Sequence, residues 1–223
     1  EMIHPAPPVD TVATRVRHRL RLAGGSLVQW GWRQAKAVGS IGPDSAAGRS
    51  FGSFGPGSIM CFPQEPFVNP GSIHLGTSTM IGPNVVLSAG WGPDHPGLPD
   101  RVVVIGDRCL IGRGSSVVGH RLIEIGDDVW TGQQVHITDM NHGYERLDVP
   151  IAAQNQPESP IRIGDGTWLG HHVVVLPGVT IGRHVVVGAG SVVTEDLPDY
   201  CVAVGSPARV IRRYLNGEWV RVP

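Results

Sequence analysis

Aromatic and charged residues are scarce in this sequence. Aromatic side chains make up 6% of its 223 residues and charged side chains 17%, so large rings do not fill its core. The 18 Lys and Arg against 19 Asp and Glu leave a net charge of −1, which gives no electrostatic footprint for nucleic acid. No apolar run reaches the ~20 residues that a membrane span needs. We therefore expect neither a nucleic-acid partner nor a membrane span.

Cysteine is also rare, with three residues far apart in the chain: Cys61, Cys109 and Cys201. An odd number at wide spacing implies no disulfide framework and fits a reducing compartment. The first residues lack the apolar core of a signal peptide. Together these features predict a cytoplasmic protein.

Glycine and proline, in contrast, are abundant. The chain has 31 Gly and 19 Pro, and Gly is about twice as frequent as its usual ~7%. A helix bundle would be interrupted everywhere at this density. Because 41% of the residues are hydrophobic, there is enough apolar surface for a core. The composition predicts a turn-rich, all-β protein of one domain.

An aliphatic residue followed by Gly recurs every six positions, from Leu75-Gly76 to Val187-Gly188. With a third aliphatic position, these residues form triplets, and only Thr131 among their fifteen members is not aliphatic: 75/81/87, 105/111/117, 125/131/137, 163/169/175 and 181/187/193. Each hexapeptide supplies a short strand with one side chain inward and a bend, where Gly allows a tight or left-handed backbone. Three hexapeptides close a coil of 18 residues, so the period predicts a triangular solenoid. Antiparallel strands recur at ~8–12 residues, which makes that alternative unfavourable.

Two long interruptions break the period, at residues 88–104 and 138–162. Both follow the third side of a coil, so we expect them to leave the solenoid at the same edge. Interruptions of a solenoid become loops, and loops carry function.

The two ends of the chain differ from the solenoid, which we place at residues 41–210. Val9, Val12, Val16 and Leu20 recur at helical spacing after Asp10, and Gly24-Gly25 is expected to end this helix. A second helix is expected over 26–39. Residues 1–40 would thus form a helical extension that caps the solenoid. Contact with a subunit or acceptor through Arg15, Arg17, Arg19 and Arg21 is the alternative, and residues 211–223 would form a C-terminal tail.

Specific motifs follow residue 126, and the residues that carry them are Asp139-Met140-Asn141-His142-Gly143-Tyr144, 163–170 (IGDGTWLG), 176–182 (LPGVTIG), 188–193 (GAGSVV) and 204–212 (VGSPARVIR). With these motifs the chain resembles the hexapeptide-repeat acyltransferases, especially sugar O-acetyltransferases of the maltose, galactoside and colanic-acid type. The resemblance implies a left-handed parallel β-helix that transfers acetyl from acetyl-CoA to a sugar or glycan hydroxyl, without a metal. It also implies a homotrimer with sites between subunits.

Acyl transfer to a hydroxyl needs a base, and histidine is the usual one. Of ten histidines, His142 matches the family position of the base, and His136 is its rival. Asp139 would either fix the imidazole tautomer, as a third group does in hydrolase triads, or form an Asx turn. On the same loop, Asn141, Tyr144 and Glu145 are the candidate substrate-binding residues.

The resemblance also assigns a binding groove for the acyl-CoA. His171, Ala189 and Thr194 would line the pantetheine arm, and Arg209 and Arg212 would contact the phosphates, for which the guanidinium fork is suited. Glu195 stands where the family often has Lys, and Arg183 and Arg213 are the candidates to compensate for this departure. Trp130 and Trp168 should face outward, and we place Trp168 with the cofactor near the acyl-transfer centre.

Three other functions stay open. The γ-carbonic anhydrases are zinc hydratases on the same fold, but their three-histidine pattern is not matched, since His136 and His142 are six apart and no His lies near position 106. A non-catalytic scaffold would have no need of His142 and Arg209. N-acylation of an amino sugar or small amine would use the same base and donor, so the sequence does not separate it from O-acylation.

Overall fold

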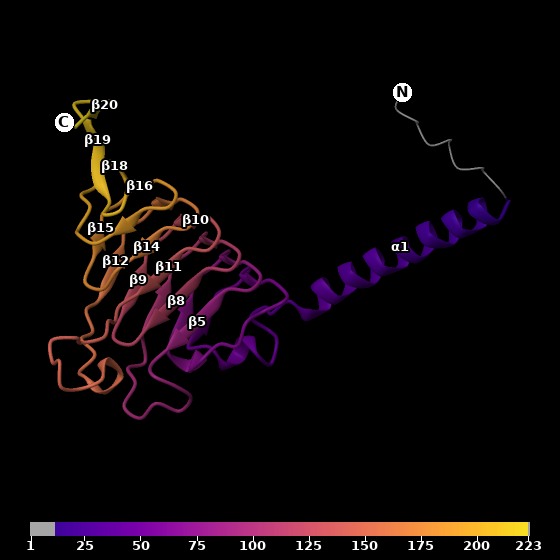
Figure 1. The fold of residues 1–223 in the computed structure, drawn as a ribbon, viewed down its shortest axis with the longest axis horizontal. Helices are drawn as coiled ribbons and strands as arrows, with labels where there is room; N and C mark the ends of the chain where they lie inside the picture. Colours follow the sequence, from indigo (N-terminus) through magenta and orange to yellow (C-terminus); the bar gives the residue numbers. More distant parts are fainter. Residues whose placement is uncertain (1–11, 223) are drawn as a thin grey trace, which may run out of the picture. The chain divides into compact units, whose positions relative to one another are not determined.

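The computed structural model describes residues 12–222, which divide into two units at residues 39 and 40. The first is one helix, α1 (Val12–Gly39), and the second is a solenoid of short strands (Figure 1). The expected helix start at Val9 and Asp10 lies outside the described residues.

The expectation of two short N-terminal helices is wrong, because α1 is continuous over 28 residues. Gly24 and Gly25 lie inside it. A glycine costs ~1 kcal/mol in a helix but keeps its N–H, so it does not break the hydrogen-bond ladder as proline does. The flanking Arg, Leu and Ala residues are good helix formers, so the helix continues past the two glycines.

The solenoid has three parallel sheets, one for each side of a triangular coil. Sheet B contains β1 (Ser53–Phe54), β3 (Ile73–Leu75), β6 (Val103–Ile105), β9 (Ile123–Ile125), β12 (Ile161–Ile163) and β15 (Thr180–Ile181). Sheet A contains β2 (Ile59–Met60), β4 (Met80–Ile81), β7 (Leu110–Ile111), β10 (Trp130–Thr131), β13 (Trp168–Leu169) and β16 (Val186–Val187). Sheet C contains β5 (Val86–Ala89), β8 (Ser116–Gly119), β11 (His136–Thr138), β14 (Val174–Val175) and β17 (Val192–Val193). The predicted left-handed β-helix is thereby confirmed.

The C-terminal segment continues sheet A rather than trailing as a tail. β18 (Cys201–Val204) pairs in parallel with β16. β19 (Arg209–Leu215) and β20 (Glu218–Arg221) then add antiparallel strands. The expected boundary at residue 211 therefore falls inside a strand. Single turns of 3-10 helix occur at Gly48–Ser50, Pro70–Ser72 and Ile151–Ala153.

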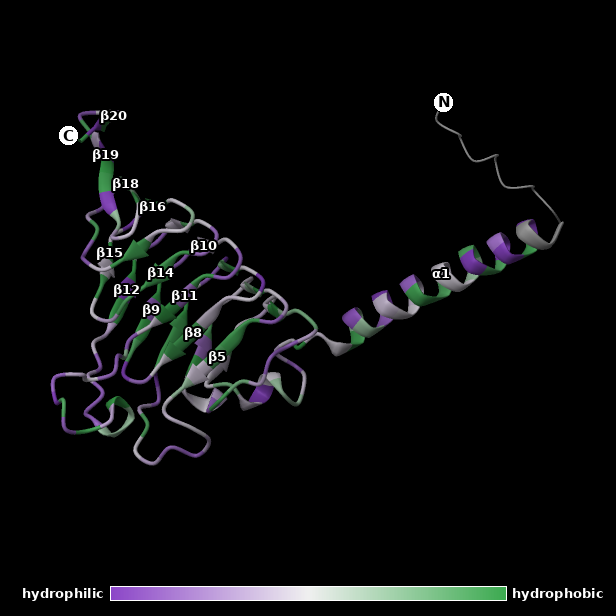
Figure 2. Cartoon of the chain, in the orientation of Figure 1, coloured by the Kyte–Doolittle hydropathy of each residue, from purple (hydrophilic) through white to green (hydrophobic). Residues whose placement is uncertain are grey.

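The core is a ladder of aliphatic side chains inside the coils, and Figure 2 shows the strands as the hydrophobic part of the solenoid. All fifteen predicted inward positions are buried. Thr131 fits because its Oγ1 accepts the N–H of Gly112 at 2.8 Å and donates to the carbonyl of Gly132 at 3.1 Å. A second buried row, two residues earlier, was not predicted: it includes Val85, Cys109, Val129, Val135, Val173, Val179 and Val185.

The recurrent glycines have a different role from the predicted one. None of the ten glycines that follow an inward residue has a positive φ. The left-handed residue is instead the second one after each glycine, for example Arg108 after Gly106 and His172 after Gly170. The glycines are required because the next coil passes too close for a Cβ atom: a Cβ on Gly132 would lie 2.6 Å from the backbone nitrogen of His171.

Replacing Gly112 by Ala should therefore destabilise the solenoid, because the added Cβ meets the carbonyl oxygen of Gly132 in the next coil. We expect a loss of ~1–3 kcal/mol in the free energy of unfolding, as for an overpacked core, measured by denaturant unfolding. Gly71→Ala is the matched control, since its Cβ would enter open space. Equal losses in the two variants would contradict the close-approach explanation.

Candidate active site

The two long loops leave the solenoid at the same corner, as predicted. β5 and β11 belong to sheet C, and the strands to which the loops return, β6 and β12, belong to sheet B. Both loops therefore project from the corner between sheets C and B, and Figure 1 shows them together at one side of the coils. One coil separates them, because β8 lies between β5 and β11.

The turn of that middle coil, residues 120–122, is hydrogen-bonded to the start of the second loop. Asp139 is fully buried, and its carboxylate accepts the backbone N–H of His120, Arg121 and Leu122 at 2.7–2.8 Å. Three donors satisfy a buried carboxylate that would otherwise be costly. Asp139 thus fixes the start of the loop to the neighbouring coil.

Neither role expected for Asp139 is found in the described part of the chain. Its carboxylate hydrogen bonds go to the turn of the preceding coil, and Nδ1 of His120 lies 3.8 Å from its Oδ1, beyond hydrogen-bond distance. The sequence could not show this, because the contact joins residues about 20 positions apart through coil stacking. The structure therefore gives Asp139 an architectural role beside the site.

Trp91 of the first loop joins all three segments at this corner. Its ring stacks on His120, with ring centroids 4.0 Å apart and an interplanar angle of 16°. Its Nε1 donates to Oε1 of Glu158 on the second loop at 3.1 Å. The base of the first loop is fixed by Asn69, whose amide donates to the carbonyls of Ala89 and Gly92. The two loops are thus linked to each other as well as to the solenoid.

A polar pocket of about 620 Å³ lies between these loops. Its lining comes from both loops and the middle turn: His95, Gly97, Leu98, Pro99, His120, Arg121, Asn155, Gln156, Pro157 and Glu158. Two of its residues hold buried polar atoms with no hydrogen-bond partner, Nδ1 of His120 and Oε1 of Gln156. Burial lowers the pKa of His120, partly offset by the charges of Asp139 and Glu158. Unsatisfied buried polar atoms are uncommon in native proteins, and a bound water, ion or ligand is one way in which such atoms gain a partner.

His142 lies on an exposed two-stranded ribbon, and the opposite strand of that ribbon, residues 155–158, lines this pocket. The N–H groups of Asn141 and Gly143 donate to the carbonyls of Pro157 and Asn155. Met140 pairs with Glu158 in the same antiparallel register. This register sets position 142 opposite position 156, and opposite residues of an antiparallel pair project to the same face. His142 is exposed, so its imidazole is open to an incoming acceptor.

The other candidates on this loop are also exposed. Asn141 accepts the N–H of His142 through its side chain at 3.0 Å, and Glu145 accepts the N–H of Tyr144 at 3.0 Å. Tyr144 is 69% exposed. In the described chain these side chains order the loop locally and leave its outer face available.

The rival base, His136, occupies a different place. It lies on β11, where its Nδ1 is 2.5 Å from the Ser116 hydroxyl. Burial lowers its pKa, which keeps the ring neutral at neutral pH. His136 is outside the loops and does not line the pocket between them.

The residues expected to bind acyl-CoA follow two corners of the last coils. His171 and Ala189 lie at the corner between sheets A and C, and Thr194 follows sheet C. All three are exposed, although Nδ1 of His171 accepts the N–H of Gln133. The three residues thus lie at the two edges of sheet C, on the outside of the coils.

The basic residues near these corners are only partly available. Arg209 lies 3.6 Å from Glu195, and both side chains are more than half exposed. Such an exposed pair is weak in water, so Glu195 holds the Arg209 side chain only weakly. Arg212 lies on β19, opposite Val202. Arg183 is bound to Asp199 at 3.0 Å, at the corner between sheets B and A, and not at the corner where Glu195 follows sheet C.

The structure does not bring Trp168 to the loop of His142 within one chain. Trp168 lies on sheet A between Trp130 and Val186, and this sheet faces away from the corner between sheets C and B. Trp130 and Trp168 do face outward, as predicted, with exposed fractions of 58% and 50%.

Within residues 12–222, no helix is long and apolar enough to cross a membrane. No group of three or more His, Cys, Asp or Glu in the same range is arranged to hold a metal ion.

Replacing Asp139 by Ala should destabilise the protein strongly, because three backbone N–H groups lose their acceptor. Each buried donor left unsatisfied costs ~1–3 kcal/mol, so we expect a loss of about 3 kcal/mol or more in denaturant unfolding. Asp148→Ala is the control, since Asp148 is an exposed loop carboxylate paired with Arg146, and it should unfold like the wild type. An Asp139→Ala protein of wild-type stability would refute the architectural role.

Comparisons with known proteins agree with this architecture. The model of the bacterial transferase hexapeptide family, "Bacterial transferase hexapeptide (six repeats)", matches residues 160–195, and "Hexapeptide repeat of succinyl-transferase" matches residues 102–130. A solved N-acyltransferase from Bacillus cereus, AntD, in complex with dTDP and coenzyme A, superposes with a TM-score of 0.66 at 22% identity. It covers 79% of this chain and 91% of its own. At this identity the likeness shows the fold alone.

Two curated relatives are more similar in sequence. An Escherichia coli protein named "Putative lipopolysaccharide biosynthesis O-acetyl transferase WbbJ" is 34% identical over 154 residues, which span 66% of this chain and 74% of the relative. A "Probable acetyltransferase" of Mycobacterium tuberculosis is 42% identical over 114 residues, 51% of this chain. The aligned part spans only 38% of that relative's length. The repeats, the family models and the coverage of the E. coli relative together show that this chain belongs to the bacterial hexapeptide-repeat transferases.

Proposed function

We propose that this protein is an acyl-CoA-dependent O-acyltransferase that transfers acetyl from acetyl-CoA to a sugar or glycan hydroxyl. The observation that carries the proposal is the position of His142, an exposed residue that lies opposite Gln156, which lines a polar pocket between two linked loops. The acetyltransferase names of the E. coli and M. tuberculosis relatives support it. The cofactor named in the Bacillus cereus structure is coenzyme A, which is the donor proposed here.

In this proposal His142 is the general base. Its neutral imidazole takes the proton of the acceptor hydroxyl while the hydroxyl oxygen forms a bond to the thioester carbonyl carbon. The carbon–sulfur bond then breaks, and the imidazolium returns the proton to the departing thiolate. Backbone N–H groups near the coil stabilise the oxyanion, a contribution worth a few kcal/mol. No residue of the chain needs to carry the acetyl group.

The pocket between the loops is proposed as the acceptor site. Its volume of about 620 Å³ lies within the ~300–1,000 Å³ typical of small-molecule pockets, so it admits a monosaccharide or the end of a glycan. The unpartnered Oε1 of Gln156 accepts a hydrogen bond from a hydroxyl or amine of the acceptor. Gln156 lies opposite His142 in the ribbon register, which places the bound group beside the base.

The donor is proposed to lie along sheet C and its corners, past His171, Ala189 and Thr194, with Arg209 and Arg212 toward its phosphates. Because these residues and the loop of His142 do not form one enclosed site in a single chain, the proposal includes a homotrimer whose sites lie between subunits, where Trp168 of one chain approaches another. Cys61, Cys109 and Cys201 are all free thiols, which supports the cytoplasmic location that belongs to the proposal.

His142→Ala should lower kcat/KM by about 10²–10⁴-fold, the usual contribution of a general base. The assay is acetyl-CoA turnover over a panel of sugars, with the product identified by its mass shift. His18→Ala, on the exposed surface of α1, is the matched control and should keep full activity. An unimpaired His142→Ala enzyme would reject the mechanism. Products formed from amino sugars alone would favour N-acylation.

Gln156→Leu should raise the KM for the acceptor about two- to tenfold, because it removes one hydrogen-bond acceptor of ~0.5–1.5 kcal/mol. The KM for acetyl-CoA should stay unchanged, which serves as the internal control. Gln29→Leu, exposed on α1, should change neither constant. Equal increases in both KM values would indicate a general disturbance and would count against an acceptor site in this pocket.

A further inference from the structure

Helix α1 concentrates the positive charge of the chain. Six basic residues and no Asp or Glu lie in Val12–Gly39: Arg15, Arg17, Arg19, Arg21, Arg33 and Lys36. All 19 acidic residues of the chain lie outside the helix. Such a segregated charge indicates an anionic partner.

The helix also carries an apolar stripe. Val16, Leu20, Ala23, Leu27 and Trp30 follow one another at spacings of three and four residues, which places them on one face. Four of these side chains are strongly exposed: Val16 50%, Leu20 68%, Leu27 67% and Trp30 55%. Arg17 and Arg19 lie at its two edges by the same helical geometry.

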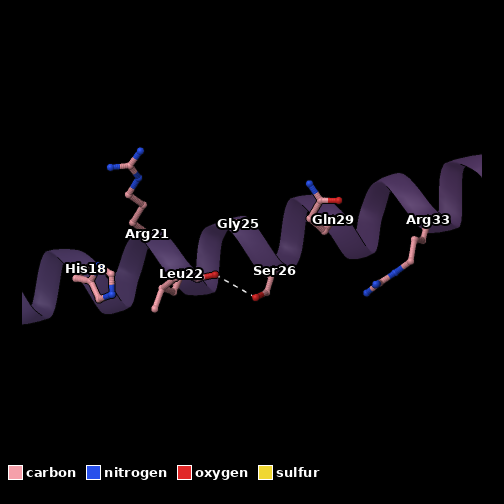
Figure 3. Close-up of a pocket in the computed structure, with 7 residues that line it drawn as sticks. All are labelled: His18, Arg21, Leu22, Gly25, Ser26, Gln29 and Arg33. Atoms are coloured by element: carbon pink, nitrogen blue, oxygen red, sulfur yellow. Dashed lines mark hydrogen bonds between the residues drawn. The ribbon is translucent and has the colours of Figure 1, made fainter.

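The opposite face carries most of the other polar side chains of the helix, together with the exposed Leu22. Figure 3 shows His18, Arg21, Gln29 and Arg33 along this face around Gly25, and the Ser26 hydroxyl donates to the carbonyl of Leu22 at 3.1 Å. With the stripe on one face and these side chains on the other, α1 is an amphipathic basic helix.

The apolar stripe requires an apolar partner that shields it from water. Within residues 15–38 every residue except Gly31 is exposed, and three glycines each cost a helix ~1 kcal/mol. The stability of such a helix comes mainly from burial of its apolar face. Nucleic acid would match the charge but would leave the stripe in water. Self-association would cover the stripe but would gather six positive charges per helix with no acidic side chain to offset them.

We propose that α1 binds the surface of an anionic lipid bilayer and lies in the plane of the interface. The apolar stripe enters the acyl-chain boundary, while the arginines at its edges extend their charged ends to the phosphate headgroups. Trp30 suits the interface because its ring is apolar and its N–H is polar. The helix attaches the protein to the membrane without crossing it. This inference is independent of the proposed acetyl transfer.

The test is flotation of the full chain with lipid vesicles. Vesicles of phosphatidylcholine mixed with phosphatidylglycerol should carry the wild type with them, whereas vesicles of phosphatidylcholine alone should not, and high salt should weaken binding. Arg17→Gln with Arg19→Gln should weaken binding about 30-fold, from about fivefold for each basic residue. Leu20→Gln with Leu27→Gln should abolish it.

Two controls keep these variants interpretable. Leu22→Gln changes the same residue type on the polar face and should float like the wild type. The unfolding transition of the β-helix should be unchanged in every variant, since the substitutions lie in the other unit. Wild-type protein that ignores anionic vesicles, or that binds neutral ones equally, overturns the proposal. A change of oligomeric state on Leu20→Gln with Leu27→Gln, seen by sedimentation without vesicles, would assign the stripe to a second copy instead.

Discussion

The spacing between stacked coils is the constraint on which the rest of this structure depends. Neighbouring strands of a sheet lie about 4.8 Å apart, so every corner of one coil passes directly over a corner of the next. A Cβ atom at the recurrent glycines would meet the backbone of the next coil, as at Gly132 and His171. The six-residue period is therefore set by backbone contact at the corners and by aliphatic contact inside. Close backbone approach selects glycine at the corners, and burial selects Ile, Leu or Val at the inward positions.

That constraint also determines where the chain can leave the solenoid. A loop that begins and ends at one corner keeps all three ladders in register, and both long loops do so at the corner between sheets C and B. Because a single coil lies between them, its turn at residues 120–122 contacts both loops. The buried carboxylate of Asp139 binds the backbone of this turn, and the Trp91 ring stacks on the imidazole of His120 in the same turn. The pocket between the loops is thus a consequence of stacking order.

The part of the structure that repeats was predictable from the sequence. The inward positions follow a six-residue period, so each of the fifteen is supported by the phase of all the others. The shared corner of the two loops follows because both begin after the third side of a coil. Contacts between loops have no period. The stacking of Trp91 on His120 joins residues almost 30 positions apart, and no spacing in the sequence indicates it. Likewise, Gly24 and Gly25 predict a helix end on propensity alone, but the residues on both sides outweigh a cost of ~1 kcal/mol each.

The division between ladder and loops explains why related proteins share this fold at low identity. The ladder needs only aliphatic, small and glycine residues in phase, a requirement that many sequences meet. It therefore superposes with a TM-score of 0.66 on an N-acyltransferase at 22% identity. The pocket residues Gln156 and Glu158 contribute nothing to that phase, so they are free to change without loss of the coil. In the proposed site the acceptor contacts lie on the two loops, whereas the donor contacts lie on the repeating coils. For that reason the fold identifies the family, and the chemistry of the pocket between the loops must identify the acceptor.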